Sequence, residues 1–98
     1  MATLEKDIEM ALGRMVRRHG GMCLKWVCPG WLGVPDRICL LPGGRTYFVE
    51  TKRPRGGKRS TMQEKWAEWL TGLGFTHLWI HTLEDISDFE WLIVCEEV

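Results

Sequence analysis

Two carboxylates and a lysine near the middle of the chain have the types and spacing of a metal-assisted hydrolytic site. Asp36 follows Pro35, and a single residue separates Glu50 from Lys52. Two acids brought together can bind a hard divalent cation such as Mg²⁺, which uses one or two carboxylates, several waters and a substrate phosphate. The cation would supply Lewis acidity, and the ammonium of Lys52 could orient a water or neutralise charge on the phosphate.

The elements around these residues are expected to place them side by side. Residues 36–41 and 45–53 are predicted to be two strands that flank a tight turn at residues 42–44, with the sequence Pro-Gly-Gly. Pairing about that turn puts Asp36 opposite Glu50, and alternation along the strand puts Lys52 on the same face as Glu50. An aspartate after proline is by itself a common turn residue, and Glu-x-Lys a common exposed charge pair. The presence of both patterns on one hairpin favours a metal-binding site.

The remaining elements follow from periodicity and from helix-capping signals. Apolar residues recur every three to four positions from residue 4 to about 19, which predicts a first helix, and residues 22–28 are a short apolar strand. Ser60 and Gln63 form a capping box, so a second helix should start there. Its expected buried stripe is Met62, Trp66, Trp69, Leu70 and Leu73.

The chain after the second helix is expected to add one more strand to the sheet. Residues 75–81 alternate as a strand, Thr82 can cap a short helix over residues 83–89, and residues 91–95 form an apolar, β-prone tail. The order helix-strand-strand-strand-helix-strand predicts an α/β fold with a mixed central sheet. A length of 98 residues fits a single domain over residues 1–98.

The net charge of zero conceals an uneven distribution of charged residues. Residues 52–59 contain five basic residues and no acid. A solvated basic loop is the plain interpretation, and a phosphate-binding loop is the functional one. Phosphate contacts, which would weaken with salt, are expected from a set of basic residues in and near this segment: Lys25, Arg37, Arg53, Arg55, Lys58 and Arg59.

Other classes of protein are disfavoured by what the sequence lacks. No apolar run approaches the roughly 20 residues of a membrane-spanning helix, and the first residues do not resemble a secretory signal. An intracellular, soluble protein is therefore expected. The four cysteines include no Cys-x-x-Cys pair, so free thiols are expected rather than a zinc site or disulfides.

Two short segments and one glutamine together resemble a known family. They are Gly33-Val34-Pro35-Asp36-Arg37, Phe48-Val49-Glu50-Thr51-Lys52, and Gln63. This pattern resembles the virus-type replication-repair nuclease (VRR-NUC) domain, which belongs to the restriction-endonuclease-like PD-(D/E)XK superfamily. The resemblance spans roughly residues 5 to 81, and the expected element order is similar to the core of that superfamily.

The resemblance implies roles for individual residues. Asp36 and Glu50 would bind Mg²⁺ or Mn²⁺, with the backbone carbonyl of Thr51 as a further ligand, and Lys52 would be the catalytic lysine. The resemblance also implies that Gln63 lies near the site and positions water or phosphate. An acid of the first helix commonly completes the set: Glu5 fits best in register, and Glu9 is the alternative.

The resemblance further implies an enzyme that cuts DNA. The expected activity is that of a structure-selective endodeoxyribonuclease acting on branched DNA such as four-way junctions, in DNA repair or a related pathway. Free-standing relatives of this size occur in phages, which implies a phage or prophage protein in the bacterial cytoplasm. These stand-alone forms resemble archaeal-type junction resolvases that act as homodimers, so a homodimer is expected. Six tryptophans are many for one small core. Trp26, Trp31 and Trp91 are the candidates for interface or DNA contacts, whereas Trp66, Trp69 and Trp79 are expected in the core.

Two alternatives remain open. A non-catalytic DNA-binding or assembly module on the same fold would also explain the basic loop and the spare tryptophans, although it would not need all of Asp36, Glu50 and Lys52. A restriction-type enzyme is less favoured because 98 residues leave no room for a separate base-reading domain.

Overall fold

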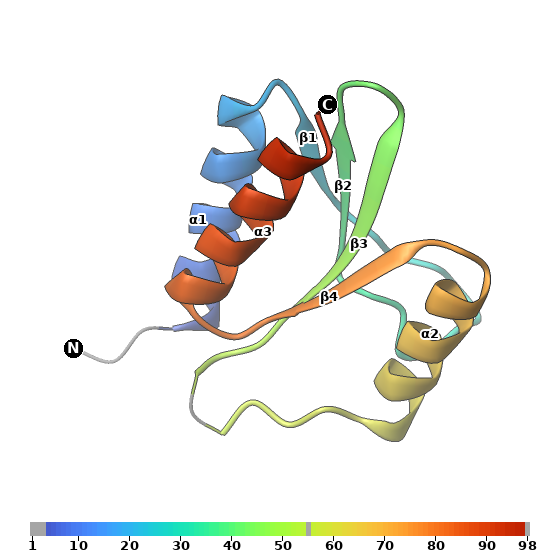
Figure 1. Ribbon diagram of the computed structural model, residues 1–98. Coiled ribbons are helices and arrows are strands. Elements are labelled where there is room, and N and C mark those ends of the chain that lie inside the picture. Colours follow the sequence, from blue (N-terminus) through green and yellow to red (C-terminus); the bar gives the residue numbers. More distant parts are fainter. Residues whose placement is uncertain (1–3, 55, 98) are drawn as a thin grey trace.

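Four strands form one mixed sheet in the order β1-β2-β3-β4 (Figure 1). The computed structural model describes residues 4–54 and 56–97. The elements in chain order are α1 (Glu5–Arg18), β1 (Met22–Lys25), β2 (Arg37–Leu41), β3 (Arg45–Thr51), α2 (Thr61–Gly72), β4 (Thr76–Ile80) and α3 (Leu83–Cys95). Strands β1, β2 and β3 are antiparallel, and β4 runs parallel to β3. The predicted α/β class, element order and mixed sheet are confirmed.

The β2–β3 hairpin has the register expected from the sequence. Leu41 pairs with Arg45 across a three-residue turn, and Arg37 pairs with Val49 at the far end. Gly43 and Gly44 both have positive φ, 85° and 74°, which only glycine adopts without strain. Continued by one residue, this register puts Asp36 opposite Glu50.

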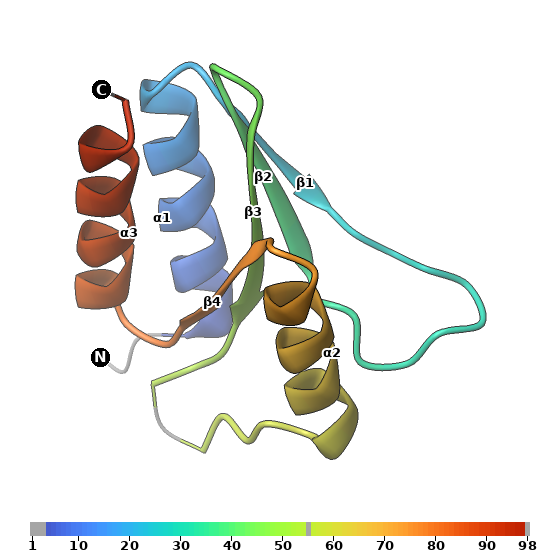
Figure 2. The same ribbon diagram turned by 45° about the vertical axis from the view of Figure 1, so that its right-hand side comes forward.

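Helices α1 and α3 lie side by side on one face of the sheet and build the core there (Figures 1 and 2). The buried apolar side chains of this layer come from both helices and from β2, β3 and β4; they are Ile8, Leu12, Met15, Val16, Cys39, Leu41, Tyr47, Val49, Ile80, Ile86, Phe89 and Ile93. Together these contacts hold α1 in fixed register against the sheet. No helix among the described residues is both long enough and apolar enough to cross a membrane.

The last helix is longer than the sequence suggested. The prediction of a short helix followed by a β-prone tail was wrong, because α3 continues through Trp91 to Cys95. Ile86, Phe89 and Ile93 follow a helical spacing and are all buried, so the tail residue Ile93 extends the apolar stripe of the helix. Trp91 points away from this stripe and is 69% exposed.

The opposite face of the sheet is covered only in part, by α2 and the loop that precedes β2 (Figure 2). Trp26 packs on Phe48, with ring centroids 5.3 Å apart, and on Trp66 at 5.8 Å. Leu70 is the buried residue of α2. The predicted stripe was wrong for Trp69 and Leu73, which are exposed. Helix α2 lies over β4 at the edge of the sheet, and no other element of the described residues covers its outer side.

Four of the six tryptophans form a half-covered cluster at the surface: Trp26, Trp31 and Trp69 each pack on Trp66. Trp66 and Trp79 are half-buried rather than enclosed, so the expectation of full core burial fails for them as it does for Trp69. Trp31 remains 57% exposed although its ring packs on Trp66 at 5.6 Å. The four cysteines are free, as predicted; Cys23 and Cys39 lie on paired strands with their sulfurs 3.9 Å apart.

Gly33 allows the loop before Asp36 to touch the start of α2. Its φ is +80°, and a Cβ built there would lie 2.6 Å from Cβ of Met62 and 2.9 Å from the backbone nitrogen of Gln63. Trp66 reinforces the contact, since its Nε1 donates a hydrogen bond to the Leu32 carbonyl at 2.9 Å. The loop therefore fixes the position of Gln63 relative to Asp36.

Replacing Gly33 with alanine should destabilise the fold strongly for two reasons. The backbone at this position is left-handed, which strains any residue with a Cβ, and the added methyl group would clash with the backbone of α2. We expect Gly33→Ala to lower the free energy of unfolding by about 2 to 4 kcal/mol in urea denaturation.

Gly30 provides the matched control in the same loop. It has a similar φ of +85°, but a Cβ there would meet nothing within 4 Å. Gly30→Ala should lose only about 1 kcal/mol, the cost of the left-handed conformation alone. Equal losses in the two variants would contradict the role assigned to the close approach.

Candidate active site

Asp36 is held in place by Thr51 at the end of β3. The Thr51 hydroxyl donates to Oδ2 of Asp36 at 2.6 Å, and the Thr51 backbone N–H donates to Oδ1 at 3.2 Å. Thr51 is fully buried, and alternation along β3 turns its side chain towards α1. The carboxylate of Asp36 therefore faces α1 with both oxygens oriented.

Two acids of α1 face this carboxylate. Glu5 and Glu9 lie one helical turn apart, and with Asp36 they offer three carboxylate oxygens that all lie within 4.8 Å of one another. Glu9 also approaches the Thr51 hydroxyl, with its Oε1 3.3 Å from Oγ1. The sequence left Glu5 and Glu9 as alternatives, whereas the fold brings both to Asp36.

Glu50 lies beside Asp36 but faces the other helix. Its Oε2 accepts a hydrogen bond from the Asp36 backbone N–H at 3.1 Å, and its Oε1 accepts one from Nε2 of Gln63 at 2.9 Å. The ammonium of Lys52 is 3.8 Å from the same Oε1. The fold thus gathers Asp36, Glu50, Lys52 and Gln63 at one end of the sheet, together with Glu5 and Glu9.

Gln63 has two tasks in this arrangement. Its Oε1 accepts the Ser60 N–H at 2.9 Å, and its own N–H donates to the Ser60 hydroxyl at 3.1 Å, which completes the predicted capping box. The side-chain amide nitrogen Nε2 takes no part in the capping box and donates a hydrogen bond to Glu50. The start of α2 is therefore tied to the site through one side chain.

Burial and repulsion from neighbouring carboxylates disfavour the charged forms of Asp36 and Glu50. Burial is the main reason that the pKa of Glu50 rises from 4.5 to about 7, and the negative charge of Asp36 adds to it against the opposing effect of Lys52. Burial also raises the pKa of Asp36, although both hydrogen bonds from Thr51 oppose the change. A divalent cation would relieve this excess of negative charge, so the donor set fits one.

The predicted phosphate-contacting residues fall into two groups. Arg53, Lys58 and Arg59 are exposed on the loop after β3, and the Arg59 guanidinium lies 4.2 Å above the ring of Trp79. Lys25 is exposed at the end of β1, next to Arg37, its partner in the β1–β2 register.

Two of these residues need separate comment. Arg37 is already engaged, because its Nη2 forms an ion pair with Oε2 of Glu9 at 3.2 Å. Arg55 lies outside the described residues.

Two features of the site were not predicted from the sequence. Thr51 was expected to contribute only its backbone carbonyl, yet its side-chain hydroxyl orients Asp36. The signal was available in strand alternation, which puts Thr51 on the opposite face from Glu50. Glu9 was ranked behind Glu5, although an i, i+4 pair on one helix can reach a single neighbour.

Comparison with known proteins supports the fold and the predicted resemblance. No family model matches the chain. A solved structure described as "VRR_NUC domain" superposes with a TM-score of 0.83 over 89% of this chain and 94% of that chain, at 24% sequence identity. The likeness shows that this chain has the fold of a VRR_NUC domain, as the sequence predicted.

A phage protein is similar over part of the chain. "Putative nuclease p44" of Acyrthosiphon pisum secondary endosymbiont phage 1 is 50% identical over 50 residues, which make up 51% of this chain and 54% of that protein. The chain therefore spans about half the length of this relative. Both findings support the resemblance to a phage-type VRR-NUC domain.

The raised pKa of Glu50 should make the metal-free protein less stable as pH rises. The folded state binds this proton more tightly than the unfolded state, so the stabilisation is fully present below about pH 4.5 and is lost as pH rises through 7. We expect a loss on the order of 2 to 3 kcal/mol across this window. Urea denaturation in chelator at a series of pH values measures it.

Glu50→Gln isolates this contribution from those of other titrating groups. The variant keeps the size of the side chain but cannot ionise, so its stability should change less across the same pH window. If the variant and the natural protein showed the same pH dependence, Glu50 would not have the shifted pKa described above.

Proposed function

We propose that this chain is a divalent-metal-dependent nuclease that hydrolyses phosphodiester bonds of DNA. The observation that supports this most is the convergence of Asp36, Glu50, Lys52 and Gln63 at one end of the sheet, with hydrogen bonds linking three of them. The fold of a VRR_NUC domain and the similarity to a phage protein named as a nuclease point the same way.

The proposed metal ligands are the acids that meet at this end of the sheet. Asp36, Glu50 and the backbone carbonyl of Thr51 would hold Mg²⁺ or Mn²⁺, and Glu5 and Glu9 would close the site from α1. A divalent cation bound there supplies Lewis acidity towards a phosphodiester and makes water a better nucleophile at neutral pH.

Residues of the chain would neutralise charge on the phosphate and position the carboxylates. In hydrolysis, a water oxygen bonds to phosphorus, one phosphorus–oxygen ester bond breaks, and the departing oxygen gains a proton. Lys52 is 15% exposed and held at 3.8 Å from Glu50, so its ammonium can neutralise charge that develops on the phosphate. Gln63 positions Glu50, and Thr51 positions Asp36.

DNA would be held mainly through its backbone. Arg53, Lys58 and Arg59 extend from the loop that directly follows Lys52, so phosphates near the reacting one can be neutralised without reading sequence. Arg59 stacks on Trp79, which limits its freedom and places its charge beside the site.

We further propose that the substrate is branched DNA and that two copies of the chain act together, as the family resemblance implies. The exposed aromatic side chains supply apolar surface for a contact between copies, with Trp31 on the loop before β2 and Trp91 on α3. A two-fold dimer would present two sites to a symmetric four-way junction.

Cleavage should need both a divalent cation and the two central acids. We expect the purified protein to cut DNA with Mg²⁺ or Mn²⁺ and not with chelator, and to prefer four-way junctions when junction, flap, single-strand and duplex substrates are compared. Asp36→Asn and Glu50→Gln should each lower the rate by about 100-fold or more while DNA binding is retained.

The control for this experiment is Asp88→Asn, which removes an exposed carboxylate of α3 and should cut normally. Undiminished cutting by both site variants would contradict the assignment. DNA binding without cleavage under any of the metal conditions would instead favour a non-catalytic DNA-binding module.

Gln63→Glu tests whether Gln63 acts on the site or only caps α2. Glutamate preserves the capping box but replaces a donor to Glu50 with a second acid, which should raise the pKa of Glu50. We expect a rate about tenfold lower near neutral pH and an acidic limb of the pH–rate profile shifted to higher pH. An unchanged profile would limit Gln63 to capping, and Glu64→Gln, at the exposed next position, serves as the control.

A further inference from the structure

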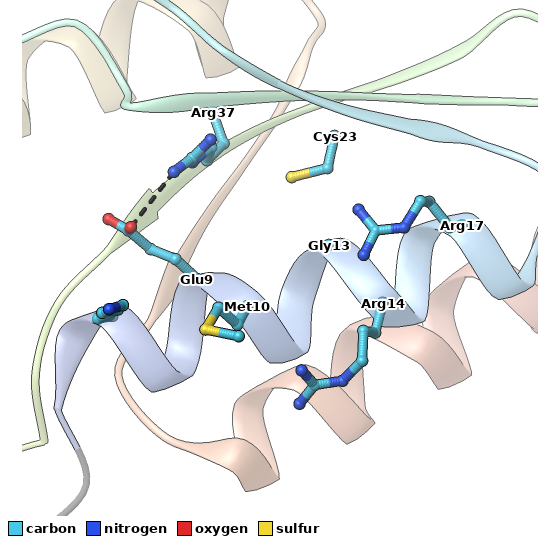
Figure 3. A pocket seen from close by; sticks show the side chains of 8 residues that line it. Glu9, Met10, Gly13, Arg14, Arg17, Cys23 and Arg37 are labelled. Carbon is cyan, nitrogen blue, oxygen red and sulfur yellow. Dashed lines mark hydrogen bonds and ion pairs between the residues drawn. The ribbon is translucent and has the colours of Figure 1, made fainter.

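A second charged feature lies next to the candidate site, on the other side of Glu9. A cavity of about 350 Å³ opens between the outer side of α1 and the strands β1 and β2 (Figure 3). Four of the residues that line it are basic: Lys6, Arg14 and Arg17 on α1, and Arg37 on β2. We refer to this cavity as the α1 groove.

The α1 groove has a surplus of positive charge. Glu9 is its acidic lining residue, and it is already paired with Arg37 at 3.2 Å. Lys6, Arg14 and Arg17 form no ion pair within 4.0 Å with any residue in the described ranges 4–54 and 56–97. Three like charges that line one concave surface attract an anion more strongly than scattered surface charges do.

A glycine in α1 leaves space in the groove for the side chain of Arg17. Gly13 lies in the middle of α1, where glycine is a poor helix residue. A Cβ at this position would lie 3.0 Å from Nη1 of Arg17, so the missing side chain lets the Arg17 guanidinium lie across the helix (Figure 3). Across the groove, Nε of Arg37 is buried and has no hydrogen-bond partner among the described residues.

The groove and the candidate site share a wall. Glu9 contacts Arg37 with one carboxylate oxygen, and its other oxygen lies 3.3 Å from the Thr51 hydroxyl that orients Asp36. From Glu9 to Arg17 the helix rises about 12 Å, whereas one DNA strand advances about 3.4 Å per nucleotide. A strand with one phosphate at Asp36 could therefore place a phosphate a few nucleotides away over the groove.

We propose that the α1 groove binds a backbone phosphate of the DNA strand, separate from the phosphate that is cut and from those at the basic loop after β3. The inference rests on the proposed nuclease function, since it takes DNA as the ligand. Arg14 and Arg17 supply the charge, and the contact reads no sequence because every nucleotide presents the same phosphate. DNA would then be held on both sides of the carboxylates.

Salt-dependent DNA binding tests the proposal directly. A short fluorescein-labelled duplex is titrated with the full chain in chelator, which prevents cleavage, between about 50 and 200 mM salt. The double variant Arg14→Ala with Arg17→Ala should bind more weakly, and the slope of log K against log salt should fall by about 1 to 2. Lysine at both positions should restore most of the slope, because the charges return.

Arg18→Ala is the matched control. It removes one positive charge from the same helix, whereas the double variant removes two, but Arg18 pairs with Glu90 of α3 at 3.0 Å and does not line the groove. Its slope should equal that of the natural protein. A double variant that keeps the natural slope would overturn the proposal, as would an equal change in Arg18→Ala.

The outcomes separate this proposal from the proposed function. If the natural protein cuts DNA but the double variant keeps the natural slope, the groove proposal fails and the nuclease stands. If no substrate is cut but the slope falls only in the double variant, the groove binds DNA on a non-catalytic module. Absence of DNA binding at low salt would overturn the groove proposal, and it would overturn the nuclease as well if no substrate were cut with Mg²⁺ or Mn²⁺.

Discussion

The register between β2 and β3 is the constraint on which the site depends. The three-residue turn pairs Leu41 with Arg45, and the ladder that follows brings the Asp36 N–H to the carboxylate of Glu50 at 3.1 Å. A slip of one residue would exchange the faces of Glu50 and Thr51. Glu50 would then lose Gln63, and Asp36 would lose the hydroxyl that orients it.

The two acids face different helices. Asp36 faces α1 and its glutamates, whereas Glu50 faces α2 and Gln63. Each acid is therefore oriented by a different layer, and both are buried enough for their pKa values to rise. A cluster of this kind weakens the fold, which is expected where residues serve a functional site rather than stability.

Local signals in the sequence predicted the elements and their pairing. The glycine-rich turn set the hairpin register, and the Ser60–Gln63 box marked the start of α2. Because both signals act within a few residues, they did not require knowledge of the tertiary structure.

Features that depend on how layers meet could not be predicted in this way. Helical periodicity groups Trp69 and Leu73 on one face of α2, but it does not show that the sheet ends beneath that face and leaves them exposed. Periodicity also does not fix how α1 is rotated against the sheet, and this rotation decides that Glu9 joins Glu5 beside Asp36. Likewise, the Asp36 side chain turns towards Thr51 and does not follow the strand alternation, because Asp36 precedes the first residue of β2.

The central claim is that the acids around Asp36 bind a divalent cation used in DNA cleavage. Anomalous diffraction from crystals containing Mn²⁺ tests it most directly, because the signal locates the ion without reference to activity. We expect a single dominant site where Asp36 is a ligand, together with at least one of its neighbouring carboxylates. An Mn²⁺ ion bound away from Asp36, or no ion at concentrations that support cleavage, would contradict the claim.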